Sequence, residues 1–156
     1  METTIISYLA ARPSRDLIVA ARQQLTRTWW DDRRPDFKVY VSQLVLAEAQ
    51  EGDADAAKRR ADVLGGLPVL DIVPEVAELA AALVERVPLP SRAAADATHI
   101  ALAAYHGMDF LITWNVAHIA NAELRQRVEQ VCRDLGYAPP MLCTPDELLG
   151  DTDVQT

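Results

Sequence analysis

Short strand-like segments alternate with helical segments along this chain of 156 residues, and this alternation limits the possible folds more than any other feature. Strand-like composition marks residues 37–41, 68–73, 109–113 and 140–143. Helical periodicity and capping residues predict helices over residues 5–11, 14–29, 42–52, 53–64, 74–86, 91–107 and 121–135, with a last helical turn at 144–147. Strands separated by helices imply an α/β fold of three layers, α/β/α, in which helices cover both faces of a central parallel sheet.

Residue types at the helix starts predict how several of these helices begin. We expect Thr3 and Thr4 to cap the first helix and Ser14 to cap the second, because their hydroxyl groups can accept the free N–H groups of a first turn. Ser42 and Asn121 are predicted caps of later helices, and Pro74 is suited to the first position of another.

The length favours one domain, because two independent cores would leave only about 80 residues for each. We therefore expect a single domain over residues 1–150, followed by a disordered tail at 151–156. Half of the residues are apolar and 24% are charged, which is a globular composition.

Composition also excludes several classes of function. A net charge of −8 argues against nucleic-acid binding by bulk electrostatics alone, although bound divalent cations would reverse the local field. Aromatic residues make up only 6%, so a base-stacking surface would be small. Neither a dinucleotide-binding glycine motif, nor a phosphate-binding loop, nor a serine nucleophile elbow is present.

Cellular location is predicted from what the chain lacks. The two cysteines, Cys132 and Cys143, form no metal-binding pair and are expected to be reduced thiols. No apolar run reaches the roughly 18 residues of a membrane span. The opening Met-Glu-Thr-Thr has no basic region before an apolar core, so we expect no signal peptide. We expect a cytoplasmic protein with no membrane partner.

Four polar residues stand near the ends of predicted strands or beside them: Glu2, Glu48, Asp96 and Asn115. Each has an ordinary explanation, namely a frayed terminus, a solvated helix face, a helix N-terminal turn and a turn or cap. Taken together, converging hard oxygen ligands are what Mg²⁺ or Mn²⁺ requires. Such an ion positions a water molecule and neutralises a scissile phosphate.

Four motifs in order along residues 1–145 resemble those of PIN-domain proteins. They are Glu-Thr-Thr with Ile-Ile-Ser-Tyr-Leu at 2–9, Glu48 with Gly52, Ala-Asp-Ala-Thr-His-Ile-Ala at 95–101, and Phe-Leu-Ile-Thr-Trp-Asn at 110–115 with His-Ile-Ala-Asn at 118–121. The opening resembles a branch in which Glu-Thr-Thr replaces the usual Asp-Thr-Asn. The resemblance implies a VapC-like toxin: a ribonuclease dependent on Mg²⁺ or Mn²⁺, paired with an antitoxin, and a homodimer.

The resemblance also implies roles for individual residues. Glu2, Asp96 and Asn115 would hold the metal, and Glu48 would complete the site or orient the attacking water. Thr113 and Arg12 would contact the RNA substrate. His99, one turn after Asp96, could orient that carboxylate or simply pack near the sheet.

Three departures from the family pattern leave other functions open. Glu2 replaces an aspartate, and the neutral Asn115 leaves three formal negative charges. Only Met1 precedes Glu2, where the family has an apolar strand, so we expect either that the natural chain starts upstream or that Met1 replaces another residue. One alternative is a PIN-like interaction module of weak or no activity. Another is a metal-dependent phosphatase for small esters, although no predicted strand is followed by the paired acidic nucleophile motif of such enzymes.

Overall fold

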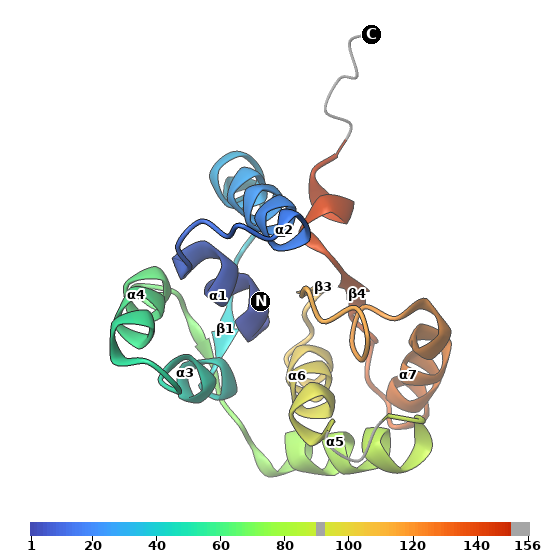
Figure 1. Cartoon of the computed structure of the whole chain (residues 1–156). Helices are drawn as coiled ribbons and strands as arrows, with labels where there is room; N and C mark the ends of the chain where they lie inside the picture. The colour runs from blue at the N-terminus through green and yellow to red at the C-terminus, as the bar shows by residue number, and fades with distance from the viewer. Residues whose placement is uncertain (90–92, 151–156) are drawn as a thin grey trace, which may run out of the picture.

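The computed structural model describes residues 1–89 and 93–150 (Figure 1). Seven α-helices lie within these residues: α1 (Thr3–Ala10), α2 (Leu17–Thr28), α3 (Gln43–Ala49), α4 (Ala54–Leu64), α5 (Pro74–Arg86), α6 (Ala94–Tyr105) and α7 (Ala122–Asp134). Four short strands accompany them: β1 (Val41–Ser42), β2 (Val69–Leu70), β3 (Phe110–Ile112) and β4 (Met141–Cys143). Shorter helical turns span Trp29–Arg33, Arg34–Asp36 and Pro145–Leu148.

The strands form two parallel pairs, which confirms the predicted α/β class with parallel connections. β1 pairs with β2, placing Val41 opposite Val69, and β3 pairs with β4, placing Leu111 opposite Leu142. Within the described residues the central sheet is thus split into two halves, each of two strands, rather than built as one continuous ladder.

The first two residues bridge the two halves of the sheet. The amino group of Met1 donates a hydrogen bond to the Tyr40 carbonyl at 2.8 Å, and the Glu2 N–H donates to the Ile112 carbonyl at 3.0 Å. The N-terminus consequently lies between β1 and β3, as Figure 1 shows. This position carries Glu2 to the edge where β1 and β3 end.

The core is divided among three apolar clusters. The largest packs α5, α6 and α7 against β3 and β4 and includes Leu83, Ile100, Leu111, Val128 and Leu142. A second packs α1 and α3 against β1. The third surrounds the buried Trp29, whose side chain is 2% exposed. Both strand pairs are therefore held by helices on either side.

Several predicted helix starts are confirmed. Ser42 and Asn121 cap α3 and α7 with side-chain hydrogen bonds, and Pro74 occupies the first turn of α5. The terminal turn begins at Thr144, whose backbone and hydroxyl group donate to Glu147 in a capping box. The predicted start of α6 at Ser91 and the predicted tail at 151–156 lie outside the described residues.

The predictions for the caps of the first two helices were wrong. Glu2, not Thr3 or Thr4, caps α1, because its carboxylate accepts the Thr4 N–H at 3.1 Å. Asp16, not Ser14, caps α2 by accepting the Val19 N–H at 2.9 Å. The strand predicted at 37–41 is also shifted, since only Val41 and Ser42 pair with a neighbour.

Both cysteines are free thiols, as the sequence predicted, and the structure shows that both are buried. Burial raises the pKa of Cys132 to about 11 and that of Cys143 to about 12, so both side chains are neutral thiols near pH 7. Among the described residues, none of the helices has the length and apolar character needed to cross a membrane.

Candidate metal centre

Glu2 is the most buried of the predicted acidic residues, with 6% of its surface exposed. Its Oε2 atom accepts hydrogen bonds from the Thr4 hydroxyl group and from the Thr113 hydroxyl group at 2.7 Å, in addition to the Thr4 N–H. The hydrogen bonds that described residues make to this carboxylate all reach Oε2. The other oxygen, Oε1, lies 4.0 Å from Nε2 of His99 and is left for another ligand.

Glu48, in the last turn of α3, faces Glu2 across this site. Its Oε2 atom accepts a hydrogen bond from the Thr3 hydroxyl group and lies 3.0 Å from Nε2 of His99. Burial raises the pKa of Glu48, but the hydrogen bonds from His99 and Thr3 outweigh it and hold the pKa below its usual value. Glu48 is therefore an anion at neutral pH.

Ligand atoms of Glu2, Glu48 and His99 all lie within 4.8 Å of one another. His99 is 3% exposed, and a proton on Nε2 would let it donate to Glu48. In that tautomer the imidazole positions the carboxylate, and two carboxylates remain to bind a hard cation.

Asp96 lies outside this cluster and forms a second one with Asn115 and His118. It occupies the first turn of α6, where the helix dipole favours a carboxylate. Its Oδ1 accepts the Asn115 side-chain amide at 2.9 Å, and its Oδ2 lies 2.8 Å from Nδ1 of His118. The Asn115 oxygen in turn accepts the His118 N–H at 3.1 Å.

Thr113 joins the two clusters. Its hydroxyl group donates to Glu2 and accepts the Asn115 N–H at 2.9 Å. Asp96 and His99 are also one turn apart on α6, so each cluster receives one residue from this helix. All four predicted acidic and amide residues thus belong to one connected network. That the metal is held by Glu2, Asp96 and Asn115 stays a prediction.

The two predicted substrate contacts have different surroundings. Thr113 is fully buried behind Glu2, and its contact with RNA stays a prediction. Arg12 lies at the surface in a separate cavity of about 360 Å³, which it shares with Arg59, Asp53 and Asp55. Its role toward substrate also stays a prediction.

Sequence reasoning missed the partners of the two histidines. His99 contacts Glu48, which is 51 positions away. One of the two interpretations of the sequence had predicted that His99 orients Asp96. His118 takes the place beside Asp96. The spacing of three residues between Asn115 and His118, which suits an asparagine cap, was a signal that could have placed His118 here.

The α/β fold gathers carboxylates near the ends of parallel strands, which is where ligand sites of such folds lie, and carboxylate oxygens suit a hard divalent ion. Residues 2–124 match the PIN domain family, and the chain therefore belongs to that family. PIN domains are generally metal-dependent nucleases that act on RNA. No curated protein and no solved structure matches the chain.

Proposed function

We propose that this chain is an endoribonuclease dependent on Mg²⁺ or Mn²⁺, of the VapC-like branch of the PIN family. The observation that carries the proposal is the pairing of Glu2 and Glu48 across a small gap, with Oε1 of Glu2 left outside the hydrogen bonds that hold Oε2. A carboxylate oxygen that no described donor holds is available to a cation, and hard divalent ions prefer carboxylate oxygens as ligands.

The donor set fits a hard divalent ion. Glu2 and Glu48 supply carboxylate oxygens. Asp96 adds a third carboxylate, which three hydrogen bonds connect to Glu2 through Asn115 and Thr113. When bound, the ion would neutralise phosphate charge and activate a water molecule. Three carboxylates repel an RNA phosphate, so these three side chains would need the ion to hold the scissile group.

The protein's residues would do three things in the reaction. Glu2, Asp96 and Asn115 would hold the ion, while Glu48 would complete the site or orient the attacking water. Thr113 and Thr4 fix the Glu2 carboxylate from behind, and His99 fixes Glu48. The reaction is in-line hydrolysis of a phosphodiester bond in RNA.

Cleavage of structured RNA in the presence of Mn²⁺ tests this proposal. Glu48→Gln should lower the cleavage rate by about 100-fold or more, since it removes a charge at the reacting centre. The matched control is Glu51→Gln, an exposed glutamate one turn away, which should keep full activity. Asp96→Asn should also abolish cleavage, and cleavage that survives it would refute the site.

We propose further that the protein is the toxin of a toxin–antitoxin pair, acts in the cytoplasm and forms a homodimer. The net charge of −8 supports a basic antitoxin segment as partner. Co-purification with the product of a neighbouring gene tests the pairing with an antitoxin, and light scattering of the pure chain tests the homodimer.

One observation favours an interaction module of weak or no activity. The Asn115 side chain is held by Asp96 and by the His118 backbone, and its oxygen is already engaged. If Asn115 keeps these two hydrogen bonds, its side-chain oxygen would not bind the ion. Calorimetry with Mn²⁺ separates the two functions, because only the nuclease requires the metal.

A further inference from the structure

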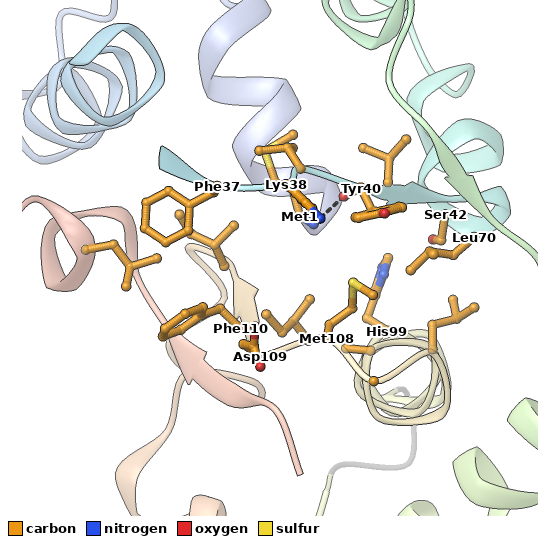
Figure 2. Close-up of a pocket in the computed structure, with 18 of the residues that line it drawn as sticks. Met1, Phe37, Lys38, Tyr40, Ser42, Leu70, His99, Met108, Asp109 and Phe110 are labelled. Atoms are coloured by element: carbon orange, nitrogen blue, oxygen red, sulfur yellow. Dashed lines mark hydrogen bonds between the residues drawn. The ribbon is translucent and has the colours of Figure 1, made fainter. Parts of the chain in front are cut away.

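Two cavities in the described part of the protein differ in their linings. The larger, of about 640 Å³, lies between the two strand pairs and includes apolar side chains such as Phe37 and Phe110, as Figure 2 shows. The smaller, of about 360 Å³, lies where the end of α1 meets the start of α4, two helices that are side by side in Figure 1. We call the smaller one the arginine cavity, because Arg12, Arg59 and Arg60 line it.

Two guanidinium groups of the arginine cavity are available to a ligand. None of the ion pairs in the described part of the chain includes Arg12 or Arg59. Nε of Arg59 donates to the Ala10 carbonyl at 3.0 Å, which leaves its two terminal nitrogens without a hydrogen bond to the described residues. Arg60, by contrast, donates to two backbone carbonyl groups near the end of α3. Free guanidinium groups bind phosphate oxygens through pairs of N–H donors.

Two aspartates reduce the positive charge of the cavity without cancelling it. Three arginines against Asp53 and Asp55 leave one net positive charge. Asp53 caps α4 by accepting the Ala56 N–H at 2.9 Å, so its carboxylate is engaged with the helix. Asp55 is exposed, and water and salt screen its charge. The balance favours an anionic ligand and predicts that Asp55 weakens its binding.

A buried glutamine fixes the loop that carries Arg12. The Gln23 side chain, in α2, is 2% exposed. It accepts the Ser14 N–H and donates to the Arg12 carbonyl, both at 3.0 Å. The backbone of Arg12 is therefore ordered before a ligand arrives, which lowers the entropic cost of binding.

The arginine cavity adjoins the candidate metal centre along α1. Thr3, whose hydroxyl group donates to Glu48, lies one turn before Ser7, which lines the cavity. Residues four positions apart share a helix face and are separated by about 6 Å along the axis. An RNA strand with its cleaved phosphate at the metal centre can therefore place a nearby phosphate in the cavity. Contacts to phosphates fix the register of a bound strand.

We propose that the arginine cavity binds a backbone phosphate of the RNA strand beside the cleaved bond, with Arg12 and Arg59 as the donors. This inference rests on the proposed nuclease function and adds to it a site that positions the strand. The resemblance implied only that Arg12 contacts RNA, whereas the cavity identifies the group that is bound and the second donor. The two guanidinium groups attract a phosphate without metal, which the carboxylates of the metal centre cannot do.

The test measures binding of a fluorescent single-stranded RNA of about 12 nucleotides by anisotropy. All chains carry Glu48→Gln, so the RNA stays intact when Mn²⁺ is present. Arg12→Gln and Arg59→Gln should each weaken binding about 10-fold, because each removes charge-assisted hydrogen bonds. Each should also lower the slope of log affinity against log salt by about 0.7. Asp55→Asn should strengthen binding.

Lys58→Gln is the matched control. It removes the same charge from an exposed neighbour of Arg59 that does not line the cavity, and it should change RNA affinity by less than about 2-fold. Arg59→Gln also loses the bond to Ala10, so melting temperatures of all variants are compared. Arg12→Gln decides the result if Arg59→Gln does not fold.

Separate arms distinguish this inference from the proposed function. With EDTA in place of Mn²⁺ the effects of both arginine substitutions should persist, since the cavity acts without the ion. Cleavage of RNA by the unsubstituted chain reports the nuclease function on its own. If that chain cleaves RNA while the arginine variants bind RNA as the control does, only the cavity proposal fails. If it does not cleave and the arginine effects remain, only the nuclease proposal fails.

Three further results would overturn the proposal. Equal weakening by Lys58→Gln and by the arginine substitutions would indicate general charge attraction. Displacement of the RNA by inorganic phosphate at micromolar concentration would assign the cavity to a free phosphate ion. Displacement by a hexaglutamate peptide, abolished by Arg12→Gln, would assign it to an acidic segment of a protein.

Discussion

Replacing Thr113 with valine should disturb the site without opening a cavity, because the two side chains are similar in size and Thr113 is fully buried. The substitution removes a hydrogen bond to the Glu2 carboxylate and leaves the Asn115 N–H without its acceptor. A hydrogen bond to a charged group contributes about 1.5–3 kcal/mol, and the second contributes about 1 kcal/mol. We therefore expect a loss of roughly 2.5–4 kcal/mol in the free energy of unfolding.

Urea unfolding in the presence of EDTA measures this loss without any contribution from bound metal. For a chain of this length the corresponding fall in melting temperature is about 5–15 °C. Calorimetry of the folded variant should also show Mn²⁺ affinity reduced about 10- to 100-fold, because the group that fixes Glu2 is gone.

Thr98→Val is the matched control. The Thr98 hydroxyl group donates only to the Ala94 carbonyl of its own helix, at 2.8 Å. We expect a change within about 0.5 kcal/mol and no change in Mn²⁺ affinity. If Thr113→Val is no more destabilising than this control, then Thr113 does not hold Glu2 as the structure indicates, and the reasoning fails.

Three other substitutions have expected outcomes. His118→Ala removes a partner of Asp96, so RNA cleavage should fall about 10- to 100-fold while the melting temperature changes little; an equal loss of both would indicate a purely structural role. Thr26→Val leaves the buried Trp114 indole N–H unpaired, and urea unfolding should show a cost of about 1–3 kcal/mol. Burial raises the pKa of Glu147, but hydrogen bonds from Thr144 and the charge of Arg125 hold it below its usual value. Its stabilisation is complete above its unfolded pKa and is lost as pH falls through the folded one, so Glu147→Gln should flatten thermal stability between about pH 5 and pH 3.

Sequence reasoning succeeded where an element is set by its own residues. The caps of α3 and α7 and the proline of α5 were predicted correctly, because each acts within one helical turn. The four strand-like segments were also found, and their parallel pairing followed from the helices between them.

The first helix shows why local reasoning then failed. Thr3 and Thr4 have suitable side chains for a cap, yet the Thr3 hydroxyl group bonds to Glu48 and the Thr4 hydroxyl group bonds to Glu2. Glu2 is consequently the residue that caps α1. The same carboxylate is held by Thr113, which is 111 positions away, and this distance hides the contact from any local pattern.

The sequence by itself determined the order of helices and strands and the order of the acidic residues along the chain, since capping, periodicity and burial act over a few neighbouring positions. Only the tertiary structure decided which carboxylate contacts which histidine, and that Asp96 pairs with Asn115 apart from Glu2 and Glu48. It also decided that a cavity lies between the two strand pairs of the sheet. These features depend on contacts between distant segments, whose geometry is fixed by how the helices and strands pack.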